Sequence, residues 1–131
     1  MTLSIRHLFI LFFMICTGIM CQPEKVDPPT LTGKLVLTQP CAGVVIQVLQ
    51  GSIDPSKIDP LWKDSITGMT YINVFTVSNQ CTFPGNLHEG DTIAFQLDSD
   101  PPPPSPLCDM CAISSPVPPI ANYVRNVRKL N

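Results

Sequence analysis

Two stretches, Thr70–Ser78 (TYINVFTVS) and Asp91–Leu97 (DTIAFQL), carry the strongest strand signals in the chain. Both are rich in β-branched and aromatic residues, which favour a pleated, half-buried backbone. In the second stretch, large apolar side chains alternate with small or polar ones, which predicts a strand with one buried face. The first stretch has large apolar residues on both faces, so we expect it to be covered on both sides.

Three more stretches have the composition of strands: Gly33–Thr38 (GKLVLT), Cys41–Gln50 (CAGVVIQVLQ) and Asn122–Leu130 (NYVRNVRKL). The intervening segments Ser52–Ser65 and Asn79–Gly90 contain proline, glycine and polar residues typical of turns, and we predict loops there. Five short strands separated by loops favour a small antiparallel barrel or sandwich.

The composition limits both the architecture and the partners. A chain of 131 residues is long enough for one domain. Its 15 prolines argue against a bundle of long helices, because proline removes a backbone donor and breaks helix interiors. The formal net charge of −2 provides no basic field for holding nucleic acid. Eight of the prolines fall within Asp100–Pro119, which predicts a single extended proline-rich loop.

The N-terminus has the pattern of an export signal. A short, weakly positive segment containing Arg6 precedes the uncharged run Leu8–Met20 (LFILFFMICTGIM). This run is too short to cross a bilayer, which needs about 20 residues, but it suits the apolar region of a signal peptide. We therefore expect residues 1–20 to be a signal peptide and the protein to be exported.

The residues at the expected cleavage site resemble those of a known family. Cys21 directly follows the apolar run and begins the polar segment CQPEK. This arrangement is similar to the lipobox of bacterial lipoproteins, and the chain resembles small cell-envelope lipoproteins of Bacteroidetes-type bacteria. The resemblance implies a lipid anchor on Cys21. Met20 departs from the pattern, because the family prefers a small residue there, and plain secretion after cleavage at Gly18 is the alternative.

The remaining chain is expected to form one folded unit. We predict a tether over residues 21–32 and a single β-domain over residues 33–131. The strand order and the turn-to-strand step Gly90–Phe95 (GDTIAF) resemble small five-stranded barrels of the OB type. The resemblance implies an OB-like all-β domain, although no helix is expected between the third and fourth strands. An immunoglobulin-like sandwich would need about seven strands.

Four cysteines follow the predicted tether: Cys41, Cys81, Cys108 and Cys111. An even number in a small exported domain predicts a disulfide framework, which offsets the limited core of so short a chain. Four cysteines allow three connectivities. We favour the two in which each cysteine of the proline-rich loop pairs with one in the body, because the loop would then be fastened twice.

The same cysteines permit other chemistry. Cys108 and Cys111 form a C-x-x-C, but no helix is predicted after them to activate a thiol, so redox catalysis is disfavoured. A structural zinc site would use all four sulfurs, although Cys41 and Cys81 are isolated in the sequence. Copper(I) capture would add Met110 as a soft ligand. We therefore keep a zinc or copper protein as the alternative and expect no cofactor.

Side chains typical of catalysis are sparse. His88 is the only histidine after the signal, and no nucleophile elbow is present, so we interpret it as a surface residue. Asp98 and Asp100 lack the spacing of a calcium loop and are interpreted as a polar turn. No catalytic or metal-ligating set is predicted.

Trp62, with Leu61 beside it, is the most distinctive feature apart from the cysteines. It lies in a predicted loop, among proline and charged residues (DPLWKD, residues 59–64). Tryptophan is enriched at the centres of protein interfaces, so Trp62 is a candidate contact residue. The alternative is that it folds back and covers one end of the barrel.

The sequence therefore predicts an exported, lipid-anchored, non-catalytic β-domain of the cell envelope, in the periplasm or on the outer-membrane surface. We expect it to act as a binding or structural module, with the membrane as a partner through its anchor and no role in nucleic-acid binding. A metal-binding protein using the four cysteines is the first alternative. A small exported enzyme of unrecognised chemistry is the second.

Overall fold

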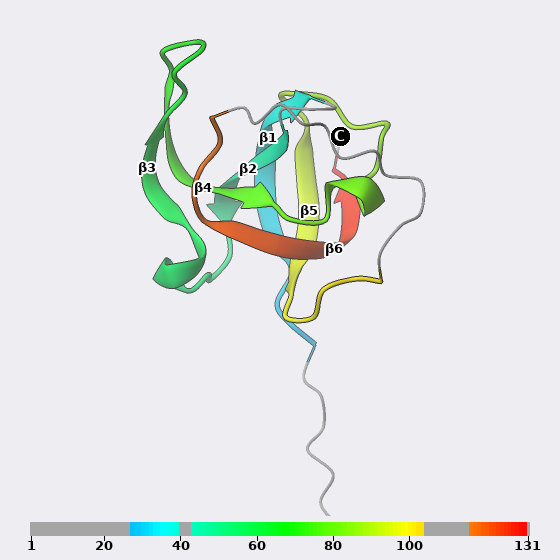
Figure 1. Ribbon diagram of the computed structural model, residues 1–131. Helices are drawn as coiled ribbons and strands as arrows, with labels where there is room; N and C mark the ends of the chain where they lie inside the picture. Colours follow the sequence, from blue (N-terminus) through cyan, green and yellow to red (C-terminus); the bar gives the residue numbers. More distant parts are fainter. Residues whose placement is uncertain (1–26, 40–42, 104–115, 131) are drawn as a thin grey trace, which may run out of the picture.

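Six strands in one mixed sheet make up the folded domain (Figure 1). The computed structural model describes residues 27–39, 43–103 and 116–130. The strands are β1 (Leu31–Gln39), β2 (Gly43–Gln50), β3 (Asp59–Lys63), β4 (Thr70–Val77), β5 (Thr92–Asp98) and β6 (Ala121–Lys129). Two single 3-10 turns, η1 (Pro55–Lys57) and η2 (Gln80–Thr82), follow β2 and β4.

Backbone pairing connects five of these strands into a ring. β1 pairs with β2, β2 with β4, β4 with β6, β6 with β5, and β5 with β1. Every pair in the ring is antiparallel except β4 with β6, which is parallel. Only Thr76 with Ala121 and Val77 with Asn122 are in register there. The ring is therefore closed by a narrow contact and is not an evenly paired barrel.

The all-β prediction is confirmed, but two of its details are wrong. The sheet is mixed rather than purely antiparallel, because the chain returns from β5 so that β6 runs in the same direction as β4. The described residues form six strands rather than five, because Asp59–Lys63, which was expected to be loop, pairs with β4. Pro60 obscures this strand in the sequence, although proline is tolerated on the edge of a sheet.

The core lies inside the ring. Phe75 on β4 and Phe95 on β5 meet there with ring centroids 5.8 Å apart and planes tilted by 53°. Ile93 points to the same interior, as the alternation in DTIAFQL predicts. Nine of the ten side chains that fill the core come from the ring strands themselves. The full set is Leu31, Leu35, Val44, Ile46, Phe75, Val77, Leu87, Ile93, Phe95 and Val124.

β4 passes through two environments. Its second half, Val74–Val77, is buried, as a strand covered on both sides should be. Its first half is largely exposed, with Thr70, Ile72 and Asn73 facing solvent. The prediction of a strand covered along its whole length is therefore right only for the half that belongs to the ring.

Gly33 allows β1 to pass close to its neighbours. A Cβ atom at this position would lie 2.6 Å from Ile46 Cγ2 and 2.9 Å from Phe95 Cε1. Side chains at those distances would force the core residues out of position. Only glycine therefore fits this point of β1 without displacing the core.

Several predictions from the sequence lie outside the described residues. They are the signal peptide (1–20), the first part of the tether, the anchor Cys21, and the three cysteines Cys41, Cys108 and Cys111. Among the residues that the structure describes, no helix is long and apolar enough to span a bilayer.

Candidate functional site

β3 and the first half of β4 form a hairpin that extends beyond the ring (Figure 1). We call this hairpin, residues 59–73, the arm. Within it, Leu61 pairs with Ile72 and Trp62 pairs with Tyr71. β3 has β4 as its only paired neighbour among the described strands, and none of those strands pairs with the outer edge of the arm.

The arm carries a concentration of exposed apolar side chains. Leu61 and Ile72, which face each other across the two strands, are 67% and 54% exposed. Ile66 and Met69, in the loop of the hairpin, are 69% and 58% exposed. Single exposed apolar residues are common on protein surfaces. Here four of the six large exposed ones in the described chain lie on one hairpin. Leu61 and Ile72 share one face of it, and we call these two the apolar patch.

Trp62 lies on the opposite face of the arm from Leu61. Its ring stacks on Tyr71, with centroids 5.9 Å apart and planes at 22°. It is half-buried and does not belong to the core of the ring. The structure thus places the candidate contact residue in the arm, where its stacking stiffens the hairpin that presents the apolar patch.

Asp64 organises the loop of the hairpin. Its backbone N–H donates to the Met69 carbonyl at 2.8 Å. Its carboxylate accepts from the Thr67 hydroxyl at 2.6 Å and from the Ile66 N–H at 2.9 Å. The bond from Thr67, followed by that from Ile66, holds the pKa of Asp64 below its ordinary value. The loop is therefore ordered by its own hydrogen bonds.

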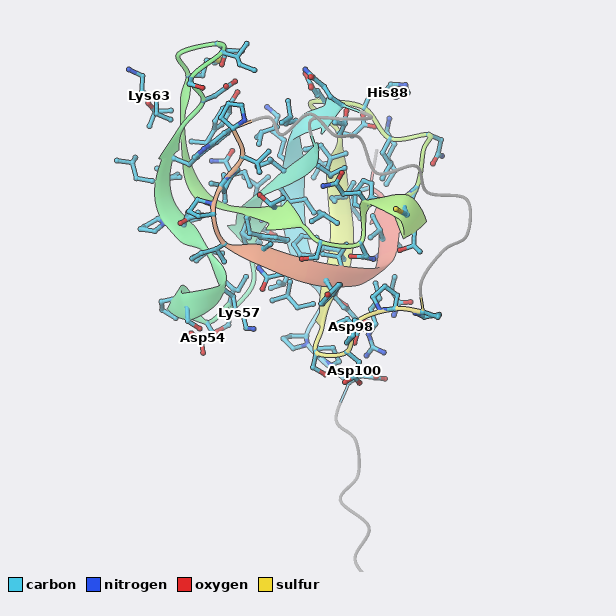
Figure 2. All side chains as sticks on the ribbon, in the orientation of Figure 1. Asp54, Lys57, Lys63, His88, Asp98 and Asp100 are labelled. Carbon is cyan, nitrogen blue, oxygen red and sulfur yellow. The ribbon has the colours of Figure 1, made fainter. Side chains whose placement is uncertain are left out.

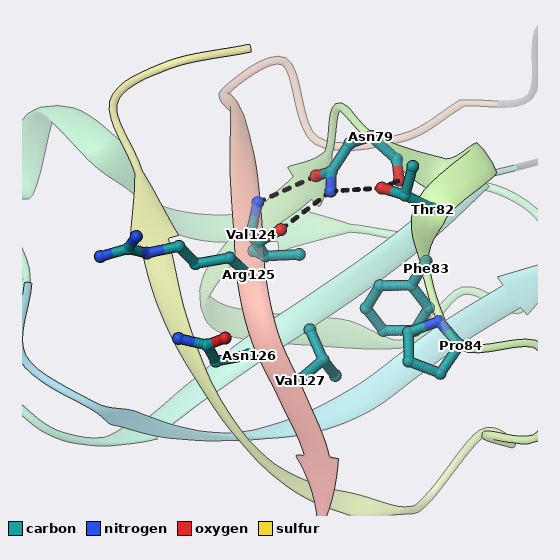
Figure 3. A pocket seen from close by; sticks show the side chains of 8 residues that line it. All are labelled: Asn79, Thr82, Phe83, Pro84, Val124, Arg125, Asn126 and Val127. Atoms are coloured by element: carbon teal, nitrogen blue, oxygen red, sulfur yellow. Dashed lines mark hydrogen bonds between the residues drawn. The ribbon is translucent and has the colours of Figure 1, made fainter. Parts of the chain in front are cut away.

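Asn79 clamps β6 beside a hollow of about 270 Å³ (Figure 3). Its Oδ1 accepts from the Val124 N–H at 2.9 Å, and its Nδ2 donates to the Val124 carbonyl at 2.8 Å. Nδ2 also donates to the Thr82 hydroxyl at 2.9 Å. The amide thus takes the place of a paired strand next to β6. Among the described residues, Arg125 is the only ionisable one that lines this hollow, so they provide no acid–base pair there.

A second hollow of about 400 Å³ also has Arg125 among its lining residues. The guanidinium of Arg125 forms an ion pair with Asp27 at 3.0 Å. Lys57 and Asp98 also line this hollow, so charges of both signs are present. Among the described residues that line it, none is a histidine, cysteine or threonine. Those residues therefore supply no cysteine nucleophile and no histidine base.

The other residues considered for chemistry are far apart. Figure 2 shows His88 and the turn at Asp98 and Asp100 at opposite ends of the domain. Asp98 Oδ1 accepts from the Asp100 N–H at 3.2 Å, which is the geometry of a polar turn. Asp91 binds Lys129 Nζ at 2.8 Å and accepts from the His88 backbone N–H at 3.0 Å, and these bonds lower the pKa of Asp91 in that order.

Cys81 is the one predicted disulfide residue among the described residues, and it lies on η2. The neighbouring Gln80 approaches Gly43: a Cβ atom on Gly43 would lie 3.3 Å from Gln80 Nε2 and 3.4 Å from Val117 Cγ1. Gly43 follows Cys41 by two residues, and Gln80 directly precedes Cys81. Val117 belongs to the predicted proline-rich loop, so these three parts of the chain meet at one place. Among the described residues, no three histidine, cysteine, aspartate or glutamate side chains gather in a way that would hold a metal.

The sequence indicates a contact at Trp62, with Leu61 beside it, but not the exposure of Ile66, Met69 and Ile72 on the same hairpin. Ile72 lies in a stretch that the sequence predicts to be covered on both sides, and Ile66 and Met69 carry no signal of their own. Comparisons with known proteins add no further site: no family model matches the chain, and no curated protein or solved structure matches it significantly.

We predict that Asn79→Ala lowers the free energy of unfolding by about 1–3 kcal/mol, because it leaves the Val124 N–H and carbonyl without partners in a partly buried place. Urea unfolding followed by circular dichroism measures this change. Asn86→Ala, at an exposed loop position, is the matched control and should leave stability unchanged. Equal stability of the two variants would show that Asn79 does not clamp β6.

Proposed function

We propose that this protein is an exported, lipid-anchored, non-catalytic binding module of the cell envelope that contacts a partner protein through its arm. The observation that carries this proposal is the apolar patch on a hairpin outside the ring. Covering one large apolar side chain contributes about 1.5–3 kcal/mol, so a partner that covers Leu61 and Ile72 gains stability that the isolated chain lacks.

The rigidity of the arm supports the same proposal. A contact surface that is already ordered loses less conformational entropy when it binds. The Trp62–Tyr71 stack holds the two strands of the arm together, and Asp64 orders the loop between them. The patch is therefore presented in a fixed shape without support from the core of the ring.

We also propose that the ring is an OB-like barrel. The strand order β1-β2-β4-β6-β5, with its single parallel pair, supports this interpretation, as does the incomplete closure, since OB-type barrels are five-stranded and partly open. In this interpretation, the arm is an insertion between the second and third strands of the barrel.

The anchor and the disulfides are part of the same proposal. β1 begins at Leu31, so nine residues separate it from Cys21, consistent with a tether between the lipid and the domain. Lipid on Cys21 would hold the domain at the membrane, because one or more acyl chains bury many methylene groups in the bilayer. Metal binding by the four cysteines remains the alternative.

The contact between Gly43 and Gln80 favours one disulfide pattern. Cys41 is two residues from Gly43, a distance of at most about 7 Å along the chain, and Cys81 adjoins Gln80. A disulfide joins Cα atoms about 4.4–6.8 Å apart. We therefore propose Cys41 with Cys81, which leaves Cys108 with Cys111, in place of the two connectivities that fasten the loop twice.

We predict that a photo-cross-linking residue placed at Ile66 captures a partner protein in intact cells, because Ile66 is exposed in the loop of the arm. The matched control is the same probe at Leu130, an exposed apolar residue outside the arm, which should capture none. Leu61→Ser together with Ile72→Ser should abolish the adduct from position 66. An adduct unaffected by these substitutions would contradict binding through the apolar patch.

Intact mass spectrometry of protein purified from membranes tests the anchor and the state of the cysteines together. We expect a chain that begins at Cys21, carries added lipid, and lacks two hydrogens for each of two disulfides. Peptide mapping without reduction should join Cys41 to Cys81. A chain with four thiols and a bound metal under native conditions would support the metal-binding alternative, and an unlipidated chain cut after Gly18 would exclude the anchor.

A further inference from the structure

We propose that the partner of the arm is a second copy of this chain, and that two β3 strands pair antiparallel, edge to edge. The inference rests on the proposed function and identifies what the arm binds. Its starting point is that β3 is the terminal strand of the sheet and pairs with β4 alone among the described strands. Such an edge presents backbone donors and acceptors to a further strand.

One hydrogen bond at the loop fixes which backbone groups of β3 point outward. The Asp64 N–H donates to the Met69 carbonyl at 2.8 Å, and the register continues without a shift through Trp62 with Tyr71. In an antiparallel ladder, hydrogen-bonded pairs alternate with pairs that are not bonded to each other. Trp62 is therefore bonded to Tyr71, as Asp64 is to Met69.

The residues on either side of Trp62 have the opposite orientation. Leu61 and Lys63 direct their N–H and carbonyl groups away from β4, toward the open edge. Proline often protects an edge strand, because it lacks an N–H. Pro60 belongs to the inward-facing set, so it removes no donor from the outer edge. The edge is thus able to accept a strand at Leu61 and Lys63.

The charges of β3 complement themselves in antiparallel pairing. A two-fold axis at Leu61 places Asp59 opposite the partner's Lys63, and this contact occurs twice. Lys63 is exposed and forms no ion pair with any described residue. Asp59 uses Oδ2 to accept from the Ile120 N–H at 3.1 Å, which leaves Oδ1 for a second donor. An edge lysine usually discourages pairing, but here it meets an opposite charge.

The same register joins the apolar patches of the two copies. Leu61 lies directly opposite the partner's Leu61, with Cβ atoms about 4.5–5.5 Å apart. Because Ile72 is the cross-strand neighbour of Leu61, one apolar row then runs across both arms. On the other face, Trp62 lies opposite the partner's Pro60. The orientation of the backbone groups, the Asp59–Lys63 contacts and the apolar row therefore all favour the same register.

The contact is small, so the dimer is expected to be weak. Stable protein interfaces bury about 1,200–2,000 Å², and two short strands with their patches provide less. A lipid anchor offsets this weakness, because molecules held on one membrane have a high effective concentration. The arm would then associate at the membrane surface and separate on dilution.

Sedimentation velocity of the full processed protein in detergent, over a range of concentrations, tests the dimer. The wild type is expected to shift from monomer to dimer as concentration rises. Lys63→Asp and Asp59→Lys each place like charges opposite one another twice, so each alone should weaken association by at least about tenfold. An equimolar mixture of the two variants restores both opposite-charge contacts and should recover wild-type association.

The controls separate loss of binding from loss of folding. Lys63→Arg keeps the charge and should dimerise like the wild type. Circular dichroism checks the fold of Asp59→Lys, because Asp59 accepts from the Ile120 N–H. If that variant does not fold, Leu61→Pro takes its place: it removes an outward N–H without breaking a bond to β4 and should remain monomeric.

Two results would overturn the dimer: a wild type that stays monomeric at every concentration, or charge variants that associate as well as the wild type. If the protein is monomeric while the Ile66 probe still captures a different envelope protein, the arm is a binding site and only the second-copy inference fails. If the probe captures nothing as well, the proposed function fails with it.

Discussion

The pairing of β4 on both of its edges is the constraint on which the rest of the structure depends. β2 takes one edge, where Val45 faces Thr76 and Gln47 faces Val74. β3 and β6 share the other edge, one after the other along β4. Asp59 of β3 also pairs with Val74, and Ala121 of β6 also pairs with Thr76. The ring closes where β6 begins, and β3 is left outside it.

The closing contact is short, and other bonds reinforce it. The Thr76 N–H donates to the Ile120 carbonyl at 2.9 Å, and the Ser78 N–H donates to the Asn122 carbonyl at 2.8 Å. The buried Thr76 hydroxyl donates to the Pro118 carbonyl at 2.7 Å. These bonds hold the second half of β4 in the ring. The first half of β4 takes no part in the ring, so it extends outward as one strand of the arm. The separation between a packed ring and an exposed arm follows from this one strand.

Much of the fold was predictable from the sequence, because the five ring strands have local signals. Alternation placed β5, and dense β-branched residues placed β2, each with bounds close to those observed. The parallel closure was not predictable, since it depends on where β6 returns after a long connection. β3 was missed for a related reason: a short segment with Pro60 becomes a strand only because β4 extends beyond the ring to pair with it.

The candidate site was predictable in part. Tryptophan in a charged, proline-containing segment indicated a contact residue, and Trp62 does lie in the arm. The exposure of Ile72 was not predictable, because it is set by where the ring ends and not by the sequence around Ile72. Exposed apolar residues on a strand resemble buried ones in sequence, and only the tertiary arrangement distinguishes them.

Amide hydrogen exchange measured by NMR tests the central claim most directly, namely that β4 closes the ring while β3 keeps an open edge. The account predicts that the Thr76 and Ser78 amides exchange slowly at every concentration, because both donate to β6 or to the residue before it. It also predicts that the Leu61 and Lys63 amides exchange quickly in dilute protein and slow down as the concentration rises. Slow exchange of Leu61 at high dilution, or rapid exchange of Thr76 and Ser78, would contradict it.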